Sequence, residues 1–112
     1  MQKNNPLPEC PETPNCHQES RSYQITGEHV RNKALTALEQ MRPELVTISS
    51  NRIDSVFVIP VFRFRDDMAI HIDQQDDKTV VHTRSASRVG TNDFGVNKRR
   101  IQKFYRILEY KL

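Results

Sequence analysis

The strongest constraint on the fold is a short run of alternating residues in the middle of the chain. In Met68–Asp73 an apolar residue is followed each time by a smaller or more polar one, with isoleucine at 70 and 72. Successive side chains of an extended strand point to opposite faces, so this run predicts a strand with one apolar face. Such a strand is typical of an antiparallel sheet that is covered on one side.

Two amphipathic segments supply the cover. From Glu28 to Met41 and from Asn97 to Leu112, apolar residues recur every three or four positions, which predicts two helices. The apolar stripes are Val30, Ala34, Ala37, Leu38 and Met41 in the first helix and Ile101, Phe104, Leu108 and Leu112 in the second. Pro43 ends the first helix because proline cannot continue one.

Three further strands are predicted, at Leu45–Ser49, Ser55–Phe64 and Thr79–Arg84. Turns are expected at 51–52 and at Asp66-Asp67, and a polar hairpin loop at 74–77. An even-length loop centred on Asp76 would place Ile72 opposite Val81 and His71 opposite His82.

The predicted fold is therefore α+β: a helix, a four-stranded antiparallel sheet and a C-terminal helix, with both helices on one face. Residues 1–24 hold four of the six prolines and both cysteines, and are predicted to form an irregular N-terminal arm. Residues 25–112 would form a single α+β domain, as a length of 112 residues suggests.

Composition limits the setting in which this chain works. There is no apolar run of about 18 residues, so no membrane span is expected. Residues 1–6 lack the apolar region of a secretory signal, so a cytoplasmic location is expected if the chain is full length. From Arg84 onward there are eight Lys or Arg and two Asp or Glu, within a net charge of +3. We expect this basic part to meet the acidic first part of the fold rather than nucleic acid.

The stretch 84–100 is the candidate site. It holds four arginines, two of the three glycines and several small polar residues. Arginine offers forked donors to a carboxylate or phosphate, and a helix that starts at Asn97 would add free backbone N–H groups. The predicted ligand-binding residues are Arg84, Ser85, Ser87, Arg88, Asn97, Arg99, Asp66 and Asp67. With Asn97 as the N-cap, Lys98, Arg99 and Arg100 would oppose the helix dipole, so an anion is expected nearby.

Three smaller groups of residues leave alternatives open. Cys10 and Cys16 are either free thiols, a small disulfide loop, a metal site with His17, or a redox pair. His71 and His82 are either a metal pair with Asp73 or Asp67, or a solvent-facing polar pair. Asp66 and Asp67 either hold a cation or act as acid and base, or they pair with the arginines of the 84–100 stretch.

The chain resembles a family of bacterial and plastid proteins, domain of unknown function 1499. The residues that carry the resemblance are Cys10-Pro-x-x-Pro-Asn-Cys16, Phe62-Arg63-Phe64-x-Asp66-Asp67, and Arg84–Gly90 with Asp93–Asn97, Arg99 and Arg100. The chain departs from the family pattern after Cys16, where His17-Gln18 precede Ser20. The resemblance implies no established activity, cofactor or partner, and many members of the family carry a signal or membrane anchor.

We therefore expect a binding module for a small anion or an acidic group of a protein partner. One alternative is a hydrolytic or redox enzyme that uses Asp66 and Asp67 with the arginines, or Cys10 and Cys16. A second alternative is a nucleic-acid or anionic-membrane surface binder that uses an exposed stripe of Lys98, Arg99, Arg100, Lys103, Arg106 and Lys111. No cofactor is indicated, because the chain has no glycine-rich phosphate loop of the P-loop or Rossmann type.

Overall fold

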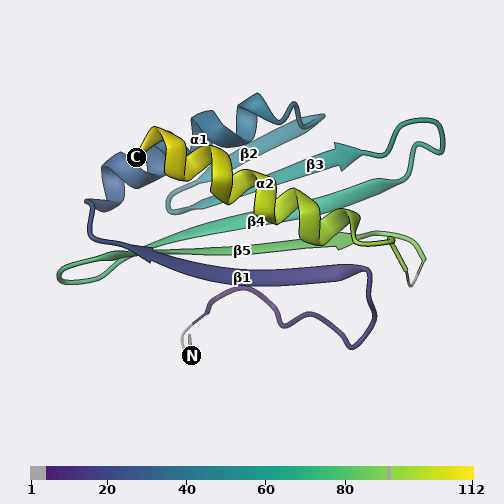
Figure 1. Ribbon diagram of the computed structural model, residues 1–112, viewed down its shortest axis with the longest axis horizontal. Coiled ribbons are helices and arrows are strands. Elements are labelled where there is room, and N and C mark those ends of the chain that lie inside the picture. Colours follow the sequence, from purple (N-terminus) through teal and green to yellow (C-terminus); the bar gives the residue numbers. More distant parts are fainter. Residues whose placement is uncertain (1–4, 91) are drawn as a thin grey trace.

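The computed structural model describes residues 5–90 and 92–112, which form two helices and five strands (Figure 1). In chain order the elements are β1 (Cys16–Tyr23), α1 (Gly27–Gln40), β2 (Leu45–Ser49), β3 (Arg52–Val58), β4 (Arg65–Gln74), β5 (Thr79–Ser87) and α2 (Val96–Lys111).

The five strands form one antiparallel sheet in the order β1-β5-β4-β3-β2. The predicted register of the β4–β5 hairpin is confirmed, since Ile72 lies opposite Val81 and His71 opposite His82. The predicted α+β class is confirmed as well. The predicted number of strands is wrong, because the second half of the N-terminal arm is a fifth strand.

Strand β1 was missed because its sequence does not alternate between apolar and polar residues. The side chains that it turns toward the helices belong to His17, Glu19, Arg21 and Tyr23. Contacts with α2 compensate for this polarity: the Arg21 guanidinium lies 4.3 Å from the centre of the Tyr105 ring and pairs with Glu109 at 2.8 Å. An edge strand can therefore be built from polar residues when the adjacent helix supplies partners.

Both helices pack on the same face of the sheet, as Figure 1 shows. The two predicted apolar stripes and the apolar face of β4 meet there in one hydrophobic core. Its buried members are Val30, Ala34, Ala37, Leu38, Ile53, Phe57, Met68, Ile70, Ile72, Val81, Ile101, Phe104, Tyr105 and Leu108. None of the helices in the described ranges is long and apolar enough to cross a lipid bilayer.

The predicted strand 55–64 is wrong at both ends. Strand β3 begins earlier, at Arg52, and ends at Val58, and the chain then turns through residues 59–64. Pro60 cannot donate a ladder hydrogen bond, and Val61 and Arg63 have positive φ values of 75° and 59°. The turn therefore precedes Asp66-Asp67, and these two residues lie in β4 rather than in the turn predicted for them.

The second face of the sheet carries no helix, and we call it the open face. Part of the N-terminal arm covers it beside β1 and β5: Leu7 is buried, and Gln18 of β1 bonds the backbone of Leu7 and Cys10. The part of the arm that the structure describes, from residue 5 onward, leaves the rest of the open face, over β2, β3 and β4, largely uncovered. The arm therefore divides this face into a covered and an uncovered part.

Candidate functional site

Strand geometry divides the arginine-rich stretch between the two faces of the sheet. In β5, Ser85 and Ser87 point to the helix face, while Arg84 and Ala86 point to the open face. Asp66 and Asp67 of β4 are divided in the same way. The residues predicted to form one anion cradle thus lie in two separate places.

On the helix face, Asn97 is the centre of a buried hydrogen-bond network. Its Oδ1 accepts from Ser85 Oγ at 2.6 Å and from Arg100 Nη1 at 2.8 Å. Its Nδ2 donates to Ser87 Oγ at 2.9 Å and to Asp93 Oδ2 at 2.5 Å. Asn97 is fully buried, and all the polar atoms of its side chain are engaged, so it has no valence left for a ligand.

Arg100 connects this network to Asp66. Its Nη2 lies 2.8 Å from Asp66 Oδ2, an ion pair without hydrogen-bond geometry, and both side chains are almost fully buried. The guanidinium also lies 4.8 Å from the centre of the Phe57 ring. The acidic residue of β4 that faces the helices therefore neutralises a buried cation, in agreement with the ion-pair alternative for Asp66.

Asn97 does not cap α2, contrary to the prediction. The helix begins at Val96, and Asp93 performs the capping role: its carboxylate accepts from the backbone N–H groups of Gly95 and Asn97. Burial alone would raise the pKa of Asp93, but the hydrogen bonds from Asn97 and Gly95 outweigh it and hold the pKa below its usual range. The anion expected at this basic helix start is therefore a residue of the protein itself.

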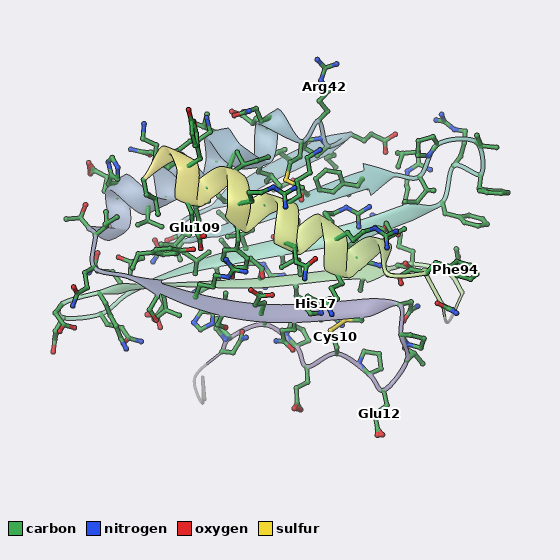
Figure 2. All side chains as sticks on the ribbon, in the orientation of Figure 1. Cys10, Glu12, His17, Arg42, Phe94 and Glu109 are labelled. Atoms are coloured by element: carbon green, nitrogen blue, oxygen red, sulfur yellow. A yellow bond between two sulfur atoms is a disulfide. The ribbon has the colours of Figure 1, made fainter. Side chains whose placement is uncertain are left out.

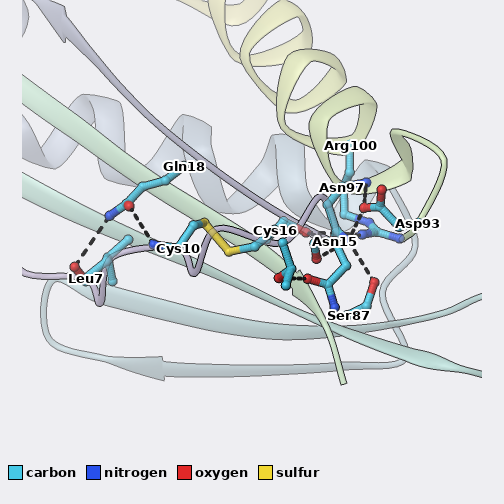
Figure 3. Close-up of a disulfide and its surroundings, with 11 residues drawn as sticks. Leu7, Cys10, Asn15, Cys16, Gln18, Ser87, Asp93, Asn97 and Arg100 are labelled. Carbon is cyan, nitrogen blue, oxygen red and sulfur yellow. Dashed lines mark hydrogen bonds between the residues drawn. A yellow bond between two sulfur atoms is a disulfide. The ribbon is translucent and has the colours of Figure 1, made fainter. Parts of the chain in front are cut away.

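Asn15 fastens the N-terminal arm to the same network (Figure 3). Its carbonyl oxygen accepts from Asn97 Nδ2 at 3.1 Å and from the backbone N–H of Ser87 at 3.0 Å. Its side-chain amide donates to the carbonyl oxygen of Gly90 at 2.6 Å. Asn15, Asp93 and Arg100 were not predicted as site residues, although all three belong to the segments that carry the family resemblance.

Cys10 and Cys16 form a disulfide that closes the short loop before β1 (Figure 3). Among the alternatives left open for these two cysteines, the structure has the small disulfide loop. His17 lies 3.3 Å from Glu19, and no group of three potential metal ligands occurs among the described residues.

On the open face, Asp67 pairs with Arg88 through two hydrogen bonds of 2.8 and 2.9 Å, and both side chains are about half exposed. Arg99, another predicted site residue, lies apart from them on α2, where its Nη1 donates to the carbonyl oxygen of Phe94. The structure thus brings Asp67 and Arg88 together and Asp66, Ser85, Ser87 and Asn97 together, and it separates the two sets.

Arg84 is the exception among the arginines of β4 and β5, because no acid neutralises it. Its Nε is buried without a hydrogen-bond partner, and it forms no ion pair within residues 5–90 and 92–112. Arg84 lines a groove of about 260 Å³ on the open face, and we call this the open-face groove. The other lining residues are Pro8, Leu45, Thr47, Arg52, Asp54, Ser55, Val56, Asp67, Met68 and Ala69.

His82 lies on β5 two residues before Arg84, on the open face and opposite Ser20 of β1. The expectation of a solvent-facing histidine pair is wrong for this residue, which is 1% exposed. Its Nδ1 lies 2.7 Å from Ser20 Oγ, and its Nε2 lies 3.8 Å from Asp73. Burial lowers the pKa of His82, and the charge of Asp73 offsets this only in part. Ser20 of β1 therefore contacts an imidazole whose protonation is disfavoured by burial.

Comparison with known proteins gives a family and distant structural similarity. Protein TTHA0849 of Thermus thermophilus superposes with a TM-score of 0.46 at 14% identity, over 86% of this chain and 95% of that one. A conserved protein of Geobacillus kaustophilus gives 0.42 at 11%, over 86% and 93%. No curated protein matches. The family model described as "Protein of unknown function (DUF1499)" matches residues 6–108, and the chain belongs to that family.

Proposed function

We propose that the domain is a binding module for a small molecule with one anionic group and an apolar body, held in the open-face groove. The single observation that carries the proposal is the position of Arg84. The side chain of Arg84 lines the groove, and its buried Nε has no hydrogen-bond partner among the described residues, so this guanidinium is not satisfied by the protein itself.

The charges around the groove support an anion rather than a cation as the ligand. Arg52 is held by Asp54 at 3.0 Å, and Asp67 is held by Arg88, so these charges cancel in pairs. Arg84 is left over. A carboxylate or phosphate bound in the groove beside the Arg84 guanidinium would neutralise its charge.

The remaining lining of the groove supports an apolar body on the same ligand. Leu45, Val56 and Ala69 lie along β2, β3 and β4, and Pro8 of the arm lies at the border of the groove. The volume of about 260 Å³ lies just below the usual range for small-molecule sites. We therefore expect a compact ligand of the size of a short-chain or aromatic carboxylate.

The residues around Asn97 are not part of the proposed site. Asn97 forms hydrogen bonds with Ser85 and Ser87, and also with Asp93 and Arg100. The polar groups of this network are therefore already paired within the protein. The residue pairs named for the enzyme alternative do not support a catalytic site either. Asp66 and Asp67 lie on opposite faces of the sheet, and the sulfurs of Cys10 and Cys16 are bonded to each other. Of the predicted ligand-binding residues, Arg84 is the one that we retain.

Thermal unfolding in the presence of acetate, butyrate, benzoate or inorganic phosphate tests the proposal. We expect the melting temperature to rise from acetate to butyrate to benzoate, because the apolar body contributes in that order.

R84Q should abolish this rise in melting temperature, and R84K should weaken it because lysine lacks the forked donors of a guanidinium. R106Q is the matched control, since Arg106 is exposed on α2 and does not line the groove, and it should respond like the parent. No shift with any probe, or an equal shift in R84Q, would refute the proposal.

A further inference from the structure

A second feature of the molecule lies apart from the open-face groove. Two loops expose large apolar side chains: the β3–β4 loop exposes Val61, Phe62 and Phe64, and the β5–α2 loop exposes Val89 and Phe94. Val61 is 90% exposed and Phe94 82%. We call these five residues the apolar tip. Isolated exposed apolar residues are ordinary on a protein surface, but five of them in two loops form a patch.

Both loops lie at one end of the sheet. Asp66 lies opposite Ser87, where β4 begins and β5 ends, and Arg88 N–H donates to the carbonyl oxygen of Arg65 at 3.0 Å. Figure 1 shows the two loops at the same end of the long axis, and Phe94 projects from this end in Figure 2. The apolar tip can therefore meet a flat surface with both loops at once.

The backbone holds these side chains outward. Val61 and Phe94 have positive φ values of 75° and 55°, a conformation that is costly for residues with a Cβ. Local hydrogen bonds maintain it: Arg63 N–H donates to Ile59, and Asn92 Oδ1 accepts from Phe94 N–H at 2.9 Å. Phe62 and Phe64 stack on each other with ring centres 5.8 Å apart. The exposure is thus a property of a defined loop structure.

The charges around the apolar tip are positive once the internal pairs are removed. Asp66 and Asp67 are neutralised by arginines, and Asp93 is occupied by backbone N–H groups at the start of α2. Three exposed cations form no ion pair within the described ranges: Arg63, Lys98 and Arg99. Aromatic side chains surrounded by free cations match the chemistry of an anionic lipid surface, where rings enter the interface and cations meet phosphates.

We propose that the apolar tip docks this domain, end-on, on an anionic membrane surface. A second copy of the chain fits less well, because a symmetric contact through this end would bring Arg63, Lys98 and Arg99 against their own copies. The occupant is a lipid headgroup layer, with Phe62, Phe64 and Phe94 at the depth of the interface. The proposal does not depend on the open-face groove, which lies on another surface of the molecule.

Sedimentation with lipid vesicles tests this inference. We expect the protein to bind vesicles of one part phosphatidylglycerol to two parts phosphatidylcholine, and to bind pure phosphatidylcholine about tenfold less or weaker still. F62S/F94S and R63Q/K98Q should each reduce binding by about tenfold or more. Added salt should weaken the binding of the parent protein.

Matched controls lie at other places on the chain. Tyr110 is 93% exposed near the end of α2, so Y110S removes an exposed ring without touching the apolar tip. R106Q/K78Q removes two charges outside the two loops. Both controls should bind like the parent, and all variants should keep its melting temperature because the altered side chains are exposed or, at Lys78, half-buried and without an ion pair among the described residues. Equal binding to neutral vesicles, undiminished binding of F62S/F94S, or self-association that replaces vesicle binding would each overturn the proposal.

Discussion

Asp66 and Asp67 are adjacent in sequence, yet their carboxylates pair with different arginines on opposite faces of β4. Asp66 meets Arg100 in the buried layer beneath α2, and Asp67 meets Arg88 at the surface. The two carboxylates also differ in solvent exposure, since Asp66 is 1% exposed whereas the Asp67 side chain is 53% exposed. Neighbouring residues of the same type therefore allow a direct comparison of a buried and an exposed ion pair.

We expect D66N to destabilise the protein by about 3 kcal/mol, because it leaves the charge of Arg100 buried without compensation. D67N should leave the midpoint of unfolding unchanged within error, because exposed pairs contribute little. Urea denaturation of the two variants measures the difference. Equal losses for both variants would contradict the assignment of faces.

N97A should be among the most damaging single substitutions in the chain. It removes a fully buried amide and leaves Ser85, Asp93 and Arg100 short of partners, so we expect a loss of about 2–4 kcal/mol in the free energy of unfolding. N32A, at an exposed position of α1, is the control and should change stability by less than about 0.5 kcal/mol. Chemical denaturation provides the measurement, and a loss in N97A no larger than in N32A would refute the central role of Asn97.

Reduction of the Cys10–Cys16 disulfide should cost about 2 kcal/mol, as expected for a bridge that closes a short loop. The loss should appear first as faster hydrogen exchange at the backbone amides of Cys10 and Ser87. The Cys10 N–H donates to the Gln18 side chain, and the Ser87 N–H donates to the carbonyl oxygen of Asn15, so both bonds depend on the position of the arm. C10S/C16S should reproduce the effect of a reducing agent, and the reducing agent should then have no further effect on this variant. An unchanged unfolding curve on reduction would show that the arm is held without the bridge.

Stability should fall as the pH decreases below about 6.5, the ordinary pKa of histidine. The pKa of His82 is lowered in the folded protein, so the unfolded chain binds the proton more readily in this range. The loss should stop growing below the folded pKa, where both states are protonated. Melting temperatures between about pH 5 and pH 8 check this. H82Q should flatten the profile relative to the parent, whereas H71Q, at a half-buried position, should keep it.

The predictable part of the fold was the part in which apolar spacing repeats. Both helices, β2 and the β4–β5 register followed from residues such as Val30, Ile72 and Ile101, because burial of a periodic apolar stripe leaves few arrangements. Strand β1 could not be found this way, since its helix-facing residues are polar and its stability depends on Arg21 and its partners on α2. Non-local pairing leaves no periodic trace in the sequence.

The residues predicted to form one candidate site are divided by the structure between the two faces of the sheet. Composition identified the 84–100 stretch, and the alternation of side chains along β5 then separates Arg84 from Ser85. Asp66-Asp67 was predicted as a turn, whereas both residues lie in β4, where their side chains point to opposite faces of the sheet. The role of Asn15 could not be predicted, because it depends on contact with Asn97 across the whole domain.

The contact between Asn15 and Asn97, 82 positions apart, sets an order of events during synthesis. Strands β2 to β5 form a meander in which each strand pairs with its sequence neighbour, so those hairpins can close as they leave the ribosome. The arm and β1 emerge before their partners, since β1 pairs with β5 and Asn15 contacts Asn97 of α2. Within this domain the arm and β1 consequently wait for the elements that follow them, and slow emergence of α2 would prolong the life of an unpaired, polar edge strand.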